Sequence, residues 1–256
     1  RWNYDALMRS KTEIGSLKFT REYLCVPIST GTALFNPEFV MKCKNKEYVL
    51  KLGHRKDKGY KYYVGVDPAI STDGDYNVIT VLEVDENMNK TIVHVDRAKN
   101  VEFRENIDKI RLIGKIFEPE EILYETNTFA KAFTQELRNV SDLNVTDFNT
   151  TRKRKQEIIL NLQMNIENGK INFPYGDNSS KKLTNMLIEE LSMFSITHSG
   201  KFEGVGAHDD LVMSLALANA ATQNSQDVFM LLDDMGLFNA PMTTNNSLGG
   251  MLGLNF

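Results

Sequence analysis

The chain contains 256 residues, and 41% of them are hydrophobic, which is enough to bury a sizeable core. The formal net charge is −4, from 30 basic and 34 acidic residues, so the composition excludes nucleic-acid binding through an overall positive field and requires a local basic patch instead. No apolar run approaches the roughly 18 residues of a membrane span, so no membrane contact is expected. Cys25 and Cys43 form no CxxC pair and have no matching His cluster, which argues against a disulfide framework or zinc site and favours a reducing cytoplasm.

Residues 1–55 show no hydrophobic pattern that would form a core of their own. Tyr4 to Leu17 predicts a helix, Phe19 to Val26 predicts an extended stretch, and Leu34 to Pro37 predicts a turn. The charged, Gly-containing stretch 51–61 has the composition of a linker. A domain boundary is therefore predicted near this stretch.

A strand is predicted at Lys61 to Asp67, read as KYYVGVD. Most of its residues are aromatic or β-branched, Gly65 interrupts them, and the run ends in a carboxylate before a proline that cannot continue the ladder. Two similar runs follow at Asn77 to Val84 and Thr91 to Ala98, separated by a turn-rich segment. These runs predict a three-stranded antiparallel meander with an aspartate at the end of its first strand.

Helices and short strands alternate in the remainder of the chain, as judged from apolar residues at helical spacing and from short apolar runs. Crossover connections through helices make strands parallel, so the later strands are expected to be parallel and to lie centrally in the sheet. The predicted class is an α/β fold with a mixed sheet, in which three antiparallel strands precede parallel crossover strands, and helices cover both faces. The predicted elements are a helix over Val101–Phe117, a strand over Glu121–Glu125, a helix over Asn127–Arg138, a strand over Val145–Phe148, a helix over Thr151–Glu167, an extended piece at Ile171–Pro174, and helices over Ser179–Met193 and His208–Thr222.

Acidic residues fall at the ends of three predicted elements. Asp67 ends the first strand, Glu125 ends the first crossover strand, and Asp209 and Asp210 lie at the start of the last helix. The first strand and the first crossover strand are expected neighbours, so these carboxylates can converge. Like charges held together raise one another's pKa values and destabilise the fold unless a cation compensates them. Oxygen ligands of this kind suit Mg²⁺ or Mn²⁺.

Three stretches, YYVGVDPAISTDGDYN, ILYETN and GAHDDLVMSLALA, together resemble the nuclease domain of the large terminase subunit of tailed bacteriophages, which has a ribonuclease H-like fold. FTREYLCVPISTGTALF resembles the segment that leads from the family's ATPase motor into the nuclease. TTRKRKQEIILNLQMNIENGKINFP resembles the family's basic helix and the short strand after it. The resemblance extends over roughly Phe19 to Thr222 and depends on the combination of these motifs in this order.

The resemblance implies that Asp67, Glu125 and Asp209 are the catalytic, metal-binding acids, with Asp210 adjoining them. Glu125 stands where the family often has Asp. Consecutive helical residues point about 100° apart, and the last helix is apolar on almost all sides, so periodicity alone does not choose between Asp209 and Asp210. The resemblance selects Asp209 as the metal ligand.

Two further aspartates, Asp73 and Asp75, lie in the loop after the first strand. Either one could be an accessory metal or water ligand, and turn chemistry beside Gly74 is the structural alternative. His208 could contact a substrate phosphate or take part in proton transfer. It could equally be an N-cap neighbour that is hydrogen-bonded to the backbone.

The function implied by the resemblance is metal-dependent endonucleolytic cleavage of double-stranded DNA with two Mg²⁺ or Mn²⁺ ions, which cuts concatemeric viral genomes during packaging into the capsid. The implied partners are an ATPase motor domain of the same polypeptide, the portal and the small terminase subunit. The implied location is the host cytoplasm, with transient residence at the phage procapsid. The chain has no G-x-x-x-x-G-K-[ST] loop, so no ATP hydrolysis is expected from it.

Three parts are predicted along the chain. Residues 1–55 are the segment leading from the motor together with a linker, 56–223 form the nuclease domain, and 224–256 form a tail that could dock on a partner, on its own domain or on nothing. The chain begins with Arg1 rather than Met, which suggests a piece of a longer protein.

DNA contacts are predicted first at the densest basic run, which opens a helix and would hold phosphates, although a solvated helix end is the alternative. A glycine-containing loop before the last helix and the start of the preceding helix supply secondary candidates. The residues are Arg152, Lys153, Arg154 and Lys155 in the run, Lys201 in the loop, and Lys181 and Lys182, with His208 as a further candidate.

Two other enzyme classes use similar carboxylates on the same fold, namely Holliday-junction resolvases and DDE-type transposases. They differ from a terminase nuclease in substrate rather than in chemistry. Sugar kinases and actin-like ATPases also begin with a strand, an Asp and a hairpin, but they need glycine-rich phosphate loops that this sequence lacks.

Overall fold

The computed structural model describes residues 3–25, 33–51, 59–69, 76–126, 130–196, 202–204 and 209–223. The chain up to Thr222 forms one compact unit. The predicted tail over 224–256 lies outside the described residues. In the described part, no helix combines the length and the apolar character needed to cross a membrane.

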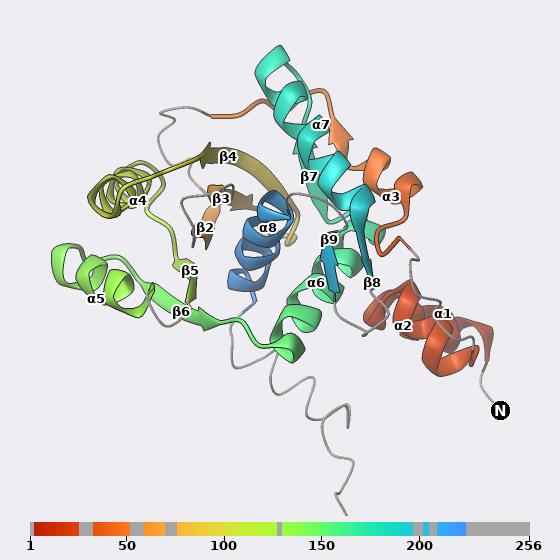
Figure 1. Ribbon diagram of the computed structural model, residues 1–256. Helices are drawn as coiled ribbons and strands as arrows, with labels where there is room; N and C mark the ends of the chain where they lie inside the picture. The colour runs from red at the N-terminus through yellow and green to blue at the C-terminus, as the bar shows by residue number, and fades with distance from the viewer. Residues whose placement is uncertain are drawn as a thin grey trace, which may run out of the picture. The chain divides into compact units, whose positions relative to one another are not determined.

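Helices and strands alternate along most of the chain, as the sequence pattern predicts (Figure 1). The helices are α1 (Tyr4–Ile14), α2 (Ser16–Tyr23), α3 (Pro37–Lys42), α4 (Phe103–Phe117), α5 (Ala130–Val140), α6 (Arg152–Glu167), α7 (Asn178–Met193) and α8 (Asp210–Ala221). The strands are β1 (Lys44–Asn45), β2 (Lys61–Asp67), β3 (Asn77–Val84), β4 (Lys90–Ala98), β5 (Glu121–Thr126), β6 (Val145–Asn149), β7 (Ile171–Pro174), β8 (Phe194–Ile196) and β9 (Phe202–Gly204).

Seven of these strands form a mixed sheet in the order β1-β7-β4-β3-β2-β5-β6. β2, β3 and β4 pair antiparallel, whereas β5 runs parallel to β2, β6 to β5 and β7 to β4. The predicted fold class is therefore confirmed. The expectation that the later strands lie centrally is wrong, because each crossover adds a strand outside the meander, and β3, which is buried at every position, occupies the centre.

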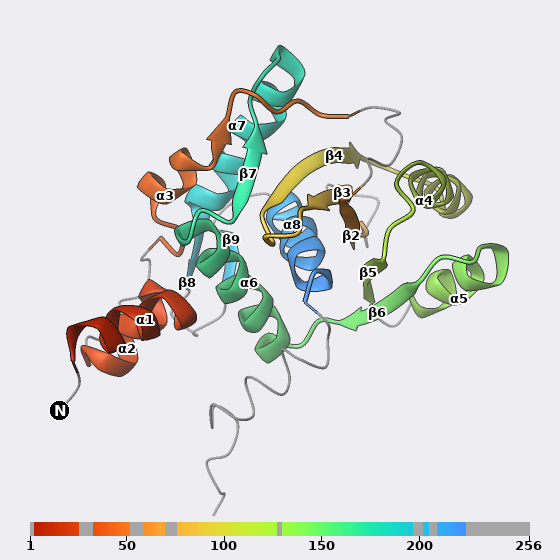
Figure 2. The ribbon, with the colours of Figure 1, turned by 180° about the vertical axis from the view of Figure 1, so that it is seen from behind.

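Each face of the sheet is covered by its own helices and has its own apolar core. On one face, β2 and β3 pack with α4 and α5 around residues such as Tyr62, Ile110 and Leu137. On the other face, α8 lies within the curve of the sheet, with α6 and α7 beside it (Figures 1 and 2). Every residue of α8 except Ala220 is buried, which explains why its sequence is apolar on almost all sides.

Gly65 lets α8 approach the middle of β2 closely. A Cβ atom at this position would overlap the carbonyl oxygen of Ser214 and the backbone nitrogen of Ala218, both on α8. The hydroxyl groups of Thr80 on β3 and Ser214 lie 2.8 Å apart and share a hydrogen bond at the same contact. The glycine that interrupts the predicted strand therefore sets the distance between α8 and the strand that carries Asp67.

Replacing Gly65 by Ala is expected to destabilise the protein by about 3 kcal/mol, because backbone atoms of α8 must move to admit the methyl group. Chemical denaturation of the variant measures this loss. Gly114→Ala on α4 is the matched control, since the three atoms nearest to its Cβ all belong to the side chain of Leu143, which can rotate, and we expect a smaller loss there. Equal losses for the two variants would contradict the close approach as the cause.

The N-terminal segment differs from its prediction. Phe19 to Val26 was expected to be extended, but the structure continues as helix α2 to Tyr23, so that prediction is wrong for its first five residues. The rings of Phe19 and Tyr23, one helical turn apart, stack at 4.9 Å between centroids, and this packing outweighs the strand propensity of aromatic residues. Gly15, with φ +80°, separates α1 from α2 within the single helix predicted over Tyr4 to Leu17.

The segment over 33–51 adds side chains to the core and a short strand to the sheet. Leu34, Phe35 and Val40 are buried in the core that α6, α7 and α8 share. β1 pairs with β7 at the edge of the sheet. Because 52–58 lie outside the described residues, the predicted boundary near residue 55 stays a prediction.

Candidate metal centre

The end of β2 and the end of β5 bring two carboxylates together. The parallel register places Val66 beside Tyr124, so the next residues along the strands, Asp67 and Glu125, are also neighbours. A side-chain hydrogen bond also joins Asp67 and Glu125. Parallel pairing of these strands thus creates the predicted convergence of the first two acids.

The start of α8 brings the third and fourth carboxylates. Asp209 is the N-cap residue of α8, and Asp210 is the first residue of the helix. The side chain of Asp210 accepts the backbone N–H of Tyr76, just before β3, at 3.4 Å, and only 9% of this residue is exposed. Close packing of α8 against β2 at Gly65 fixes both aspartates relative to Asp67.

The four carboxylates act on one another electrostatically. Burial raises the pKa of Asp67 well above its usual range, and Glu125, Asp210 and Asp209 raise it further, in that order. A site with this excess of negative charge is suited to a cation. The available ligand atoms are carboxylate oxygens, which fit Mg²⁺ or Mn²⁺. Among the described residues, however, no three His, Cys, Asp or Glu side chains already stand in a ready-formed metal-binding arrangement.

Lys155, the last residue of the predicted DNA-binding run, points into the acidic cluster. Its Nζ lies 3.0 Å from Oδ2 of Asp209 and 5.7 Å from the ring centre of Phe194. The ammonium group therefore already neutralises one of the four carboxylates. A metal ion that binds Asp209 would therefore compete with this lysine for the carboxylate.

The other three basic residues of the run point elsewhere. The guanidinium of Arg154 lies 4.1 Å from the ring centre of Phe148 on β6, and its Nη1 donates to the carbonyl of Asn149 at 3.3 Å. Arg152 and Lys153 are exposed at the start of α6. This start is capped by Thr151, whose hydroxyl oxygen accepts the N–H of Arg154. Arg152 and Lys153 are thus the members of the run best placed to meet a phosphate backbone.

The remaining predicted residues lie away from this cluster or outside the described part. Lys181 and Lys182 are near the start of α7, and Nζ of Lys181 lies 5.9 Å from the ring centre of Tyr175. Glu190 near the other end of α7 contacts the start of α8, so these lysines are roughly 13 Å from it along the helix. The predicted residues that the structure does not describe are Asp73, Asp75, Lys201 and His208.

The model of the terminase RNaseH-like domain family matches residues 64–221, which include all four carboxylates. The chain belongs to this family. Comparison with curated protein sequences gives no match. The family assignment confirms the resemblance drawn from the DPA, ETN and HDD motifs.

Solved structures show the same fold at low sequence identity. The large terminase nuclease of thermophilic phage G20c is 22% identical, with a TM-score of 0.58, and the match covers 73% of this chain and 97% of that one. This nuclease has also been solved with bound magnesium and with bound cobalt. The large terminase nuclease domain of Thermus phage P74-26 is 21% identical, with a TM-score of 0.55 and coverage of 72% and 93%. The large terminase of bacteriophage HK97 is 12% identical, with a TM-score of 0.55 and coverage of 86% of this chain and 51% of that one.

Sequence reasoning missed two residues beside the carboxylates of this terminase domain. Glu190 of α7 accepts backbone N–H groups of Leu211 and Val212, and its Oε1 lies 3.6 Å from Nη2 of Arg97 on β4. Burial raises the pKa of Glu190 to about 7, although these N–H groups and Arg97 oppose the rise. The sequence around Glu190 and Arg97 does not indicate a role at the site, because each contacts an element that is distant in the sequence.

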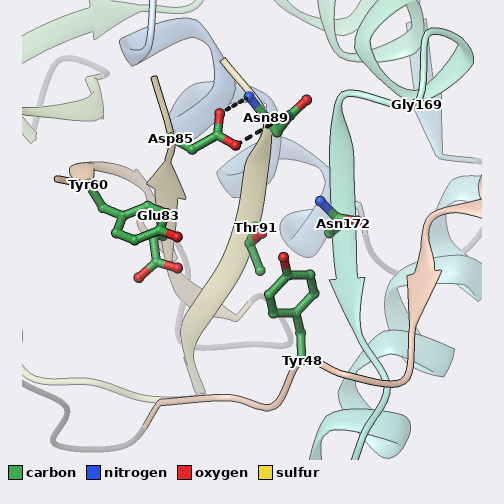
Figure 3. Close-up of a pocket in the computed structure, with 8 residues that line it drawn as sticks. All are labelled: Tyr48, Tyr60, Glu83, Asp85, Asn89, Thr91, Gly169 and Asn172. Carbon is green, nitrogen blue, oxygen red and sulfur yellow. Dashed lines mark hydrogen bonds between the residues drawn. The ribbon is translucent and has the colours of Figure 1, made fainter. Parts of the chain in front are cut away.

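A polar cavity of about 310 Å³ is lined in part by Glu83, Asp85, Asn89 and Thr91, at the end of the meander where β3 turns into β4 (Figure 3). This is the opposite end from the carboxylates. The lining of the cavity includes Glu83 and Asp85, near the end of β3 that pairs with the first residue of β2, roughly 20 Å along the strand from Asp67. Its acids already have partners, since Glu83 accepts from Lys51 and Tyr62, and Asp85 accepts from Asn89. This cavity is therefore separate from the candidate metal centre.

Proposed function

We propose that this chain is a metal-dependent endonuclease that cleaves double-stranded DNA with two Mg²⁺ or Mn²⁺ ions, and that it cuts concatemeric viral genomes during packaging. The observation that carries the proposal is the cluster of Asp67, Glu125, Asp209 and Asp210 in a terminase RNaseH-like domain. The bound magnesium in the G20c nuclease, which has the same fold, supports the choice of ion.

The position of each acid suggests which metal ion it would hold. Asp67 lies between Glu125 on the neighbouring strand and the aspartates of α8, so its carboxylate would be the ligand shared by two ions. Glu125 would hold one ion, and Asp209 and Asp210 would hold the other. Bound divalent ions supply the chemistry of an activated water and of charge stabilisation at the leaving oxygen. No protein nucleophile is required.

Lys155 would exchange partners when the ions and DNA bind. Its ammonium group is 3.0 Å from Asp209 in the metal-free protein, and a metal ion on Asp209 would displace it by charge repulsion. A displaced Lys155 could then contact a phosphate beside the site. Arg152 and Lys153, which precede it on the same helix, would hold the duplex on the exposed side.

The wider role rests on the family. Terminase membership favours an ATPase motor in the same polypeptide, a portal and a small terminase subunit as partners, with activity in the host cytoplasm at the procapsid. The same membership favours a packaging nuclease over a Holliday-junction resolvase or a transposase. The division into a leading segment over 1–55, a nuclease domain over 56–223 and a tail over 224–256 is part of this proposal.

The proposal is tested by incubating the purified chain with supercoiled plasmid in Mg²⁺, in Mn²⁺ and in EDTA. We expect nicked and linear products with either ion and none in EDTA. A four-way DNA junction serves as the competing substrate. Absence of plasmid cleavage with both ions, or preferential resolution of the junction, would contradict the proposed function.

Neutralising Arg152 and Lys153 to Gln is expected to weaken DNA binding for all sequences and to reduce the slope of log K against log salt by up to about 2, since each phosphate contact contributes about 0.9. Fluorescence anisotropy over a salt series measures the slope. The matched control is the double Gln variant at Lys181 and Lys182, for which we expect a smaller change. An unchanged slope in the first variant would mean that Arg152 and Lys153 make no phosphate contacts and only form a solvated helix end.

A further inference from the structure

The N-terminus of α8 is capped by a residue from another helix. An aspartate at an N-cap position usually accepts the backbone N–H of the second or third helical residue through its own side chain. Asp209 occupies the N-cap position of α8 but makes no such hydrogen bond. Oε2 of Glu190 on α7 accepts those two N–H groups instead, from Leu211 at 2.8 Å and from Val212 at 3.3 Å.

Glu190 is held in this role by its surroundings. The residue is 8% exposed, and its second carboxylate oxygen lies 3.6 Å from Arg97. The guanidinium of Arg97 stacks 3.4 Å from the ring centre of Tyr76, and the backbone N–H of Tyr76 donates to Asp210. These contacts link Glu190, through β4 and the start of β3, back to the first residue of α8.

With Glu190 as the cap, the Asp209 carboxylate makes no hydrogen bond to the N–H groups at the start of α8. Because Glu190 occupies the two N–H donors that Asp209 would otherwise bind, Oδ2 of Asp209 extends to Lys155. We infer that Glu190 is a positioning residue of the metal centre: it caps α8 in place of Asp209, and thereby keeps Asp209 available to a metal ion and fixes where Asp210 begins the helix. This inference rests on the proposed function, because it takes the acidic cluster to be the metal site.

Without the Glu190 carboxylate, the N–H groups at the start of α8 and a metal ion would compete for the Asp209 carboxylate. In Glu190→Ala, the N–H groups of Leu211 and Val212 lose their acceptor, and the side chain of Asp209, as the N-cap residue, is the usual acceptor for N–H groups at these positions. A metal ion would then have to detach Asp209 from its own helix before binding. We expect metal affinity to fall by about tenfold, as is common when a residue that orients a metal ligand is lost.

The experiment is a titration of the metal-free full chain with Mn²⁺, followed by the electron paramagnetic resonance signal of the free ion, together with plasmid cleavage over the same Mn²⁺ range. In Glu190→Ala we expect weaker Mn²⁺ binding, a rise in the Mn²⁺ concentration for half-maximal cleavage, and a cleavage rate at saturating Mn²⁺ close to that of the wild type. If only Mn²⁺ affinity falls and the rate at saturating Mn²⁺ is kept, the variant has lost the positioning of a metal ligand rather than its structure in general.

Two matched variants separate the hydrogen bonds from the charge. Glu190→Gln retains an oxygen that can accept both N–H groups and is expected to bind Mn²⁺ within about threefold of the wild type. Glu189→Ala removes the same charge from the exposed neighbouring position of α7 and is expected to leave Mn²⁺ binding unchanged. If Glu190→Ala does not fold, Glu190→Asp gives the same test, since it keeps the charge but shortens the side chain by one methylene.

Wild-type Mn²⁺ affinity in Glu190→Ala, or in Glu190→Asp, would overturn the positioning role. A loss in Glu190→Gln equal to that in Glu190→Ala would also overturn it, because charge rather than capping would then be the cause. If the wild type itself neither bound Mn²⁺ nor cut DNA, the proposed function would fail, and this outcome is recognisable before any variant is compared.

Discussion

Replacing Asp67 by Asn is expected to reduce metal-dependent plasmid cleavage by more than about a hundredfold and to raise the stability of the metal-free protein. The loss of activity follows from the central position of Asp67 between Glu125 and the aspartates of α8. The gain in stability follows from its pKa, which burial and these neighbouring acids raise well above the usual range. An acid whose pKa is raised by folding destabilises the native state at pH values above its unfolded pKa, where the unfolded chain is ionised at lower cost.

The expected gain for Asp67→Asn is about 1–2 kcal/mol in the free energy of unfolding at neutral pH, and it is lost as the pH falls below the unfolded pKa of about 4, because wild-type Asp67 is then protonated in both states. Urea denaturation at several pH values, in EDTA, measures the difference from the wild type. Comparing the two proteins at each pH cancels the titration of the groups that do not interact with Asp67.

Asp85→Asn is the control, because its expected change in stability has the opposite sign to that of Asp67→Asn. Burial alone would raise the pKa of Asp85, but the hydrogen bonds it accepts from the side chain and N–H of Asn89 and from the N–H of Asn87 outweigh this effect and lower the pKa. This variant should keep full cleavage and lose a little stability. Undiminished nicking by Asp67→Asn would remove Asp67 from the site, and loss of both activity and stability would make it a structural residue.

The fold could be predicted from the sequence wherever a pattern extended over several residues. The meander and the helices after it were recognisable from alternating or helical spacing, and the register of β2 and β5 then brings Asp67 to Glu125. β1, β8 and β9 are only two or three residues long, so no periodicity marks them. Gly65 was visible as an interruption, but its reason, the close approach of α8, depends on a helix about 150 residues later.

The candidate site could be predicted as a set of acids but not as an arrangement. Lys155 stands in a run of four basic residues and has no sequence feature that separates it from the other three, yet it contacts Asp209. Glu190 follows another glutamate on α7 and was not singled out, because an N-cap from a different helix leaves no trace at the capped position. Contacts between distant elements, rather than local composition, decide both roles.

The two aspartates at the start of α8 are expected to differ in importance. The family resemblance selects Asp209 as the main ligand, and helical periodicity does not choose between them. The structure gives a reason to weigh Asp210 more heavily, because Asp210 raises the pKa of Asp67 more than Asp209 does. Asp210 is also buried, whereas Asp209 is only half-buried and already paired with Lys155.

We therefore expect Asp210→Asn to abolish plasmid cleavage at every Mn²⁺ concentration, since the α8 aspartate that is more strongly coupled to Asp67 would be lost. We expect Asp209→Asn to raise the Mn²⁺ concentration for half-maximal cleavage by about tenfold and to regain most of its rate in excess Mn²⁺. Cleavage rates over a Mn²⁺ series measure both effects. The reverse order would restore Asp209 as the main ligand, as the resemblance has it. Full activity in both variants would mean that α8 supplies no ligand, and that the raised pKa of Asp67 reflects packing rather than a metal site.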